Sequence, residues 1–227
     1  TARGQVLLVT NRGRAFKTDV LPLPVLPEQS GTVSLSGGMA AGELVDLQAG
    51  ERVVGIAPLT DTESPGLALG TRSGTVKVCA PEWPVRSDEF EVITLKEGDE
   101  VVGATWLRGP DETLVFVTSE ASLLRYPASL VRPQGLRGGG MAGINVGSDA
   151  KVVFFGAVRT DDDEHGEPMV VTSTGQSVKV TPFAAYPAKG RATALSSMRA
   201  GSGPHHPRRS PDSSATHATR HQELGGL

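Results

Sequence analysis

A hairpin-like motif occurs four times in this chain, and such a repeat constrains the fold more than any single residue. Each copy is an apolar run ending in threonine, then a turn, then a shorter alternating run that carries a basic residue. The motif threonines are Thr10, Thr71, Thr118 and Thr172. Glycine stands three places after each, except in the third copy, which has Ala121. β-Branched runs on either side of a turn residue predict a β-hairpin in every copy.

A second motif, apolar run, polar turn, apolar run, falls between the hairpins at residues 47–55, 95–103 and, more loosely, 146–154. Together the two motifs offer about four short strands in about 50 residues, the size of one propeller blade. No stretch combines a sustained helical period with capping residues, so almost no helix is expected. The sequence therefore predicts an all-β, propeller-like fold of about four to five four-stranded blades.

A glycine stretch precedes the second motif in two of the units. Leu35–Gly42 and Leu136–Gly143 share Gly-Gly-Met-Ala, which indicates duplication, and Pro187–Leu195 is related to them. The second unit has Val85–Val92 in this place. Adjacent glycines are costly inside a helix or strand, so Gly138–Gly140 is interpreted first as backbone geometry between strands.

Composition agrees with a turn-rich β-protein. The chain has 28 Gly and 16 Pro without a collagen-like period, and it has no apolar run long enough for a transmembrane helix. The single cysteine, Cys79, excludes an internal disulfide, fits a reducing cytosol and is expected to be a small strand residue. The absence of an initiator Met indicates a piece of a longer chain.

The repeats end near residue 200. Residues 1–200 are predicted to form the β-domain and 201–227, rich in Ser, Pro, His and Arg, a disordered tail. The fourth unit is therefore incomplete. Its closing strand either comes from the N-terminus, as in many propellers, or is missing.

The net charge of −3 argues mildly against nucleic acid, but the acids are clustered whereas basic residues recur in repeat register. One basic residue caps each return strand, a place where packing alone would not require one: Lys17, Lys77, Arg125 and Lys179. Three more lie in hairpin turns, Arg12, Arg14 and Arg72, and four flank the glycine stretches, Arg132, Arg137, Lys189 and Arg191. Cations at such regular spacing suit contacts to DNA phosphates, which need no base recognition.

Other constellations favour structural roles. Residues 161–165, Asp-Asp-Asp-Glu-His, lack the spacing of a calcium loop and are interpreted as an inter-blade loop. Trp83 and Trp106 are expected to pack rather than to stack on bases, and Tyr126 and Tyr186 are expected to be structural. No catalytic triad, P-loop or zinc spacing is present in the sequence.

The alternation of Val-Thr-x-x-Gly hairpins with Gly-Asp-x-Val-Val-Gly turns resembles the C-terminal domain of bacterial type IIA topoisomerase A subunits, over about residues 4–200. The resemblance implies a β-pinwheel, a propeller-like disc whose outer rim binds and bends double-stranded DNA. It implies that the catalytic tyrosine, ATP and Mg²⁺ act elsewhere in the enzyme, with no cofactor in this domain. The implied partners are the rest of the A subunit and the ATPase B subunit. The resemblance also implies a cytoplasmic location at the nucleoid, with no membrane partner.

One departure bears on which of these enzymes the chain resembles. Gyrase A subunits carry a Gln-Arg-Arg-Gly-Gly-Lys-Gly box in the first blade, whereas here the best partial match is Gln134–Gly140 in the third unit. The first unit has no basic residue at the equivalent place. A degenerate box favours topoisomerase IV over gyrase. The alternative function is a propeller that binds protein partners and has no role on DNA; a propeller hydrolase has no supporting residues.

Overall fold

The computed structural model of the chain describes residues 4–25, 37–61, 63–159, 166–173, 178–193 and 196–197. All four predicted hairpins are present and antiparallel. They are β1 (Gln5–Thr10) with β2 (Arg14–Asp19), β4 (Gly66–Thr71) with β5 (Thr75–Cys79), β8 (Thr113–Thr118) with β9 (Ser122–Pro127), and β12 (Met169–Ser173) with β13 (Val178–Pro182). Three turn residues, Gly13, Gly74 and Ala121, have positive φ as the motif predicts. The fourth, at position 175, lies outside the described residues.

Three of the hairpins are central pairs of four-stranded sheets, here called blades 1 to 3. Blade 1 adds β3 (Val53–Pro58) and β6 (Glu89–Glu91), blade 2 adds β7 (Val101–Leu107) and β10 (Met141–Ala142), and blade 3 adds β11 (Val152–Val158) and β14 (Ser196–Ser197). Blade 4 is the pair β12–β13 in the described part. The predicted all-β fold of four-stranded blades is thus confirmed, with little helix: α1 (Ala41–Leu44) and the 3₁₀ turns Ala128–Leu130 and Phe183–Ala185.

The repeat unit and the blade turn out to differ. β6 follows β5 in the chain but pairs with β2 of the preceding hairpin, and β10 likewise pairs with β5 and β14 with β9. Blades 1, 2 and 3 therefore each receive their outermost strand from the next unit. The segments that carry these strands are called straps here: strap 2 (80–91), strap 3 (128–142) and strap 4 (183–193, with β14).

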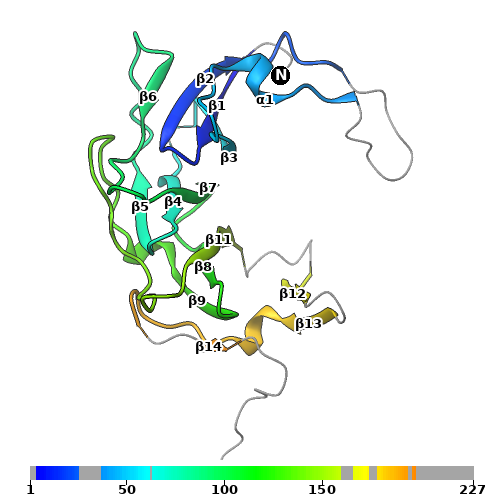
Figure 1. Cartoon of the computed structure of the whole chain (residues 1–227), viewed down its shortest axis with the longest axis vertical. Coiled ribbons are helices and arrows are strands. Elements are labelled where there is room, and N and C mark those ends of the chain that lie inside the picture. Colours follow the sequence, from blue (N-terminus) through cyan, green and yellow to red (C-terminus); the bar gives the residue numbers. More distant parts are fainter. Residues whose placement is uncertain are drawn as a thin grey trace, which may run out of the picture.

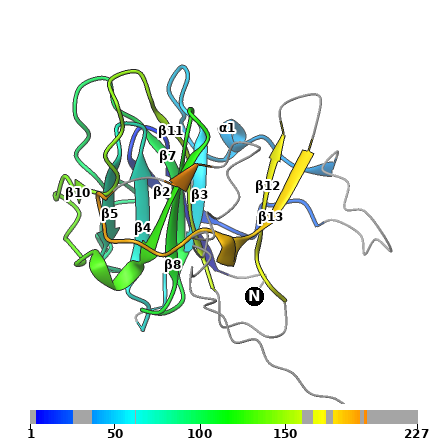
Figure 2. The ribbon, with the colours of Figure 1, turned by 90° about the horizontal axis from the view of Figure 1, so that it is seen from below.

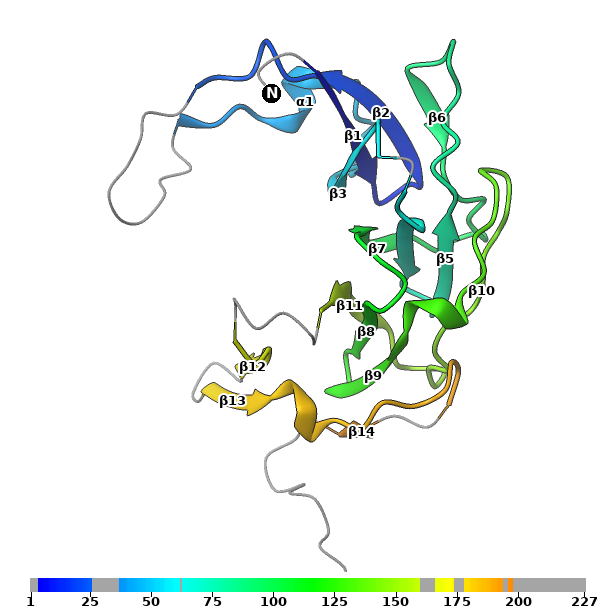
Figure 3. The same ribbon diagram turned by 180° about the vertical axis from the view of Figure 1, so that it is seen from behind.

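The blades are arranged in a crescent. Figures 1 and 3 show β3, β7 and β11 toward its hollow, while β6, β10 and β14 lie toward the convex side. Figure 2, turned by 90°, shows the strands lengthwise, with β12 and β13 set apart from the other blades. The straps thus form the outer rim of the crescent, and a ligand that binds the rim would contact them.

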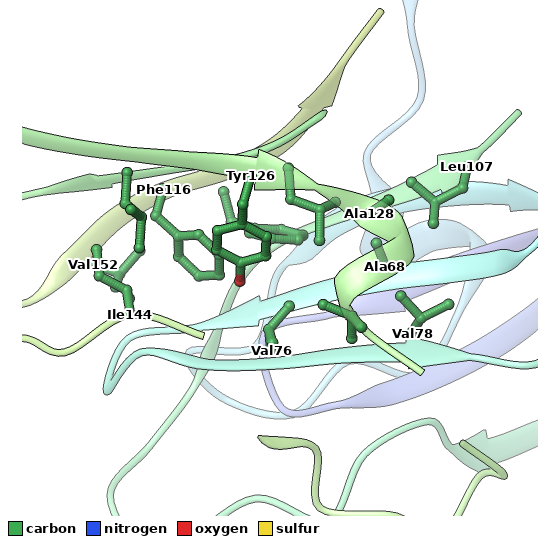
Figure 4. Packing of buried hydrophobic residues seen from close by; sticks show 13 residues of the cluster. Ala68, Val76, Val78, Leu107, Phe116, Tyr126, Ala128, Ile144 and Val152 are labelled. Carbon is green, nitrogen blue, oxygen red and sulfur yellow. The ribbon is translucent and has the colours of Figure 1, made fainter. Parts of the chain in front are cut away.

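Apolar side chains fill the spaces between successive blades. Leu7 and Val9 of blade 1 pack with Leu67 and Leu69 of blade 2. Between blades 2 and 3, a larger cluster is built around Phe116, whose ring centroid lies 4.8 Å from that of Phe155 and 6.0 Å from that of Tyr126, as Figure 4 shows in part. A smaller cluster joins Val115 and Leu123 of blade 3 to Phe183 and Tyr186 of strap 4. The core is therefore a series of blade interfaces.

The expected structural residues are found in these interfaces. The ring centroid of Trp83 lies 5.8 Å from that of Phe90 and 6.3 Å from that of Trp106, which confirms packing. Cys79 is buried at the end of β5. No helix among the described residues is long and apolar enough to span a membrane. Residues 161–165 and the predicted tail lie outside the described residues.

Glycine in the second motif allows neighbouring blades to approach each other closely. A Cβ atom at Gly55 of blade 1 would lie 2.3 Å from the carbonyl oxygen of Ala104 in blade 2, and one at Gly103 would lie 2.3 Å from that of Phe155 in blade 3. The obstacle in both cases is backbone, which cannot rotate away. The repeated Val-Val-Gly is therefore explained by strand-to-strand contact along the concave side.

We expect Gly103→Ala to lower the free energy of unfolding by about 1–3 kcal/mol, because the added methyl group separates blades 2 and 3. Gly109→Ala is the matched control, since its Cβ would meet no atom within 4 Å. Urea unfolding of both variants measures the difference. Equal stability of the two variants would contradict the close approach.

Candidate nucleic-acid interface

Lys77 on β5 lies in the interior. Its side chain is 0% exposed, and its Nζ donates hydrogen bonds to the carbonyl oxygens of Val92 (2.7 Å) and Leu136 (2.8 Å). Burial lowers the pKa of this ammonium from its ordinary value. The prediction that Lys77 contacts DNA at the rim is therefore wrong, because phosphate has no access to it.

Its register in the hairpin places Lys77 on the opposite blade face from Lys17. Lys77 stands six places after its motif threonine and pairs with Leu69, whereas Lys17 stands seven places after Thr10 and pairs with Leu7. Successive side chains of a strand point to opposite faces, so a shift of one residue changes the face. Lys77 consequently shares the face of Leu67 and Leu69, which packs on blade 1. The sequence contained this signal in the spacing.

Lys17 and Arg125 have partners of the same kind as Lys77. Lys17 Nζ donates to the carbonyl of Pro84 in strap 2, and Arg125 Nε donates to that of Tyr186 in strap 4. The guanidinium of Arg125 also lies 4.4 Å from the ring centroid of Phe183. With Lys77 and Leu136 of strap 3, all three return-strand cations bind the strap of the following unit. Packing does require them, contrary to the expectation from sequence.

Lys179, the fourth of these cations, is half-buried on β13. It lies in a Val-Lys-Val run like that of Lys77, but it stands seven places after its motif threonine, as Lys17 and Arg125 do, and it pairs with Thr172. Its side chain shares a face with Val170, which packs toward blade 3. Its place resembles that of a strap-binding cation more than that of a free surface charge.

Arg14, at the start of β2, is held by carboxylates. It forms ion pairs with Glu51 (Nη2 to Oε2, 2.6 Å) and with Glu89 of strap 2. Burial alone would raise the pKa of Glu51, but the hydrogen bonds from Arg14 and from the Thr10 hydroxyl outweigh it and lower that pKa to about 2. The pKa of Arg14 is raised by the same contacts. This cation joins blade 1 to strap 2.

The two other turn cations are exposed but also have partners. Arg12 Nη2 donates to the carbonyl of Ala49 at 3.3 Å. Arg72 pairs with Glu100, which also accepts from Arg52 at 3.5 Å and from Asn11 at 3.1 Å. Burial would raise the pKa of Glu100, and these partners lower it. A carboxylate therefore offsets the charge of Arg72, whereas Arg12 is bound to a backbone carbonyl.

The cations of strap 3 differ from all of these. Arg132 and Arg137 are exposed, and neither side chain has a hydrogen-bond or ion-pair partner in the part of the chain that the structure describes. The partial gyrase-type box here is a turn, in which Gln134 Oε1 accepts from the Gly140 amide at 3.1 Å. Gly138–Gly140 therefore serve the backbone conformation of this turn, as expected. Arg137, next to them, is exposed on its surface.

Strap 4 lies directly beside strap 3. The Ala192 amide donates to the carbonyl of Gly143 at 2.9 Å, and Arg191 Nη1 donates to that of Ala142. Lys189 and Arg191 are half-buried on this strap. The two straps form one continuous stretch of rim with four cations.

Charge is distributed unevenly over the rim. Residues 128–142 and 183–193 contain no Asp or Glu, whereas residues 80–91 contain Glu82, Asp88, Glu89 and Glu91 against the single cation Arg86. A polyanion is attracted to the first two segments and repelled by the third. The repeat pattern does not predict this difference, although the number of acidic residues in each strap does. No cluster of three or more metal-ligating residues occurs among the described residues.

Comparisons with known proteins agree with this architecture. The family described as DNA gyrase C-terminal domain, beta-propeller, matches residues 4–26, 91–105 and 112–159. The chain is 31% identical over 191 residues to the DNA gyrase A protein of Escherichia coli, and 28% identical over 191 residues to that of Mycobacterium tuberculosis. These alignments cover 83% and 82% of this chain but 20% and 21% of the relatives, so the chain spans about a fifth of their length.

Solved structures show the same fold. The C-terminal domain of DNA topoisomerase IV superposes with a TM-score of 0.69 at 24% identity, over 84% of this chain and 57% of that one. The C-terminal domain of E. coli ParC gives 0.62 at 18% identity, over 88% and 78%. The gyrase A C-terminal domain gives 0.59 at 17% identity, over 84% and 58%. The predicted β-pinwheel is thereby confirmed.

We expect Lys77→Met to lower the free energy of unfolding by about 1–3 kcal/mol, because the buried carbonyl of Val92 and the partly buried carbonyl of Leu136 lose their donor. Lys96→Met, at an exposed position, is the control and should change stability by less than about 0.5 kcal/mol. Thermal unfolding provides the measurement. A stable Lys77→Met variant would contradict a strap-binding role for this ammonium.

Stability should also fall in acid because of Glu51. Its pKa is lowered in the folded state, so the stabilisation is complete above the unfolded pKa near 4.5 and is lost as the pH falls toward about 2. The loss should be about 2–3 kcal/mol. Urea unfolding between pH 5 and pH 2 should show a shallower decline in Glu51→Gln than in Glu97→Gln, an exposed control. Equal losses of stability in the two variants between pH 5 and pH 2 would exclude Glu51 as the source of the acid sensitivity.

Proposed function

We propose, on the premise that this chain belongs to the C-terminal domains of bacterial type IIA topoisomerase A subunits, that it binds double-stranded DNA on the rim formed by straps 3 and 4. The observation that carries the proposal is that straps 3 and 4 lie side by side, contain no Asp or Glu of their own, and carry Arg132, Arg137, Lys189 and Arg191. Binding is independent of sequence, since side chains on a convex rim reach phosphates rather than base edges.

A convex array of cations also favours bent DNA. Bending a short site costs about 1–6 kcal/mol and is offset when the bend brings more phosphates to the rim. In this proposal the second strap takes no part in the contact, because its four acids repel the backbone. The bend is therefore confined to the arc of blades 2 to 4. Lys17, Lys77, Arg125 and Arg14 act indirectly by fixing the straps.

The chain acts in this proposal as the DNA-binding part of a larger enzyme that changes DNA topology. Strand cleavage, ATP and Mg²⁺ belong to the B subunit or to the rest of the A subunit. The domain supplies a site that holds a duplex close to that machinery. No described residue is assigned a catalytic role.

The test is duplex binding measured by fluorescence anisotropy over a series of salt concentrations. Arg132→Gln with Arg137→Gln should lower the slope of log K against log salt by about 2, because each lost phosphate contact removes about one unit. Both side chains are exposed and make no internal contact in the described part, so folding should be unaffected.

Arg86→Gln is the matched control, an exposed arginine on the acidic second strap, and should leave the slope unchanged. An equal loss in the control and the double variant would contradict the assignment to straps 3 and 4. A wild-type chain that fails to bind duplex DNA at low salt would reject the function itself and favour the protein-binding alternative.

A further inference from the structure

The interface between blades 3 and 4 contains a pocket of about 360 Å³. Its walls come from strands β8, β9 and β11 of blade 3, from residues 168–172 of blade 4 and from Phe183 at the start of strap 4. Every side chain in the lining is apolar except that of Thr172, and none is charged. Figures 1 and 3 show blade 4 beside blade 3 at one end of the crescent. The pocket is therefore bounded by two blades and a strap, which suits a compact ligand.

A departure from the repeat explains why this interface is not filled. Phe154 stands where the second motif has Gly55 and Gly103 in the two other units. The strand register agrees, since Gly103 pairs with Gly70 of its hairpin and Phe154 pairs with Val117. Gly55 and Gly103 allow the backbone of the next blade to approach their strands directly. The side chain of Phe154 excludes such an approach by blade 4.

The Phe154 ring itself forms one wall of the pocket. A Cβ atom at Gly156, two residues further along β11, would lie 3.0 Å from Phe154 Cζ, so the ring lies over its own strand. Phe183, also in the lining, is 2% exposed, and its ring centroid lies 4.4 Å from the guanidinium of Arg125. Two aromatic rings thus line the same pocket, and contacts within the chain position both of them.

The pocket leaves apolar surface in contact with water. Phe154, Met169 and Val171 belong to its lining and are 52%, 48% and 64% exposed. By contrast, Val9 and Leu69 at the interface of blades 1 and 2 are 0% exposed. Covering apolar surface is favourable in proportion to its area. An apolar ligand would therefore gain free energy here that the other blade interfaces already gain from their own side chains.

The lining also selects the chemical class of the ligand. An enclosed apolar cavity of about 150 Å³ has room for benzene, so the larger pocket here has room for two fused rings. Phe154 and Phe183 offer stacking or edge-to-face contacts, and the flexible side chain of Met169 adapts to the shape of a ligand. A charged group would lose its hydration without gaining an ionic partner. The hydroxyl of Thr172 suits one polar group on the ligand.

We infer that the pocket between blades 3 and 4 is a binding site for a small, uncharged aromatic molecule of about two fused rings. The bound molecule fills the interface and joins blade 4 to blade 3. The inference does not depend on DNA binding, because the pocket lining includes none of the cations assigned to DNA, Arg132, Arg137, Lys189 and Arg191. An apolar segment of protein is the competing occupant.

The test is calorimetric titration of the full chain with naphthol, which is uncharged at neutral pH. One molecule should bind per chain, with a dissociation constant on the order of 0.1 mM. Naphthalene sulfonate has the same rings and a negative charge, and it should bind at least about tenfold more weakly, because the lining has no cation. Adsorption to the basic straps would give the opposite order of affinity.

Val117→Phe places a third ring in the pocket lining. It should weaken naphthol binding at least about tenfold and leave thermal stability equal or higher, because the added ring fills space that the ligand would occupy. Val153→Phe is the matched control, since Val153 lies on β11 outside the lining and is 57% exposed. It should leave the affinity for naphthol unchanged.

Naphthol that fails to bind, as expected if a protein segment occupies the pocket, would overturn the inference. Binding without saturation, equal affinity for the sulfonate, or equal affinity in the two valine variants would overturn it as well. Hydrogen exchange in the unmodified chain is an independent readout that needs no variant. Naphthol should slow exchange in residues 168–173 and leave residues 5–10 of blade 1 unchanged. Equal effects on both segments would reject the site.

Discussion

Strand donation between repeat units is the interaction on which the rest of this structure depends. Each hairpin by itself is a two-stranded ribbon, which is only marginally stable in water. The strand that arrives from the next unit supplies the backbone hydrogen bonds of the outer edge and carries the chain across the blade interface. The blades are therefore linked by backbone as well as by apolar packing, and their order along the crescent follows from the order of the repeats.

Strand donation also explains why a cation recurs in the hairpins. A strap crosses the end of a blade with unpaired carbonyl groups, and a buried carbonyl without a donor is costly. Lys17, Lys77 and Arg125 supply the donors, and so a positive charge recurs in each hairpin of a chain with a negative net charge. The positive charges that a polyanion can reach are those on the straps themselves, where Arg132 and Arg137 are exposed.

The sequence predicted the hairpins, the turn positions and the fold family, because these depend on local pattern and on repetition. It did not predict which unit completes which blade, since a two-residue strand such as β10 leaves almost no periodic signal. It also gave Lys77 a surface role, although a spacing of six rather than seven residues after the threonine already placed that side chain on the other face. The reason for Gly55 and Gly103 could not be predicted from the sequence either, because the backbone that excludes a Cβ atom there belongs to the neighbouring blade.

In the proposed function, straps 3 and 4, and not strap 2, form the DNA-binding rim. Hydrogen exchange with and without a duplex of mixed sequence tests it most directly, because it reports on every strap in one experiment. Slower exchange on DNA binding is expected in residues 128–143 and 183–193, with no change in residues 80–91. Protection of residues 80–91 equal to that of the two basic straps would contradict it.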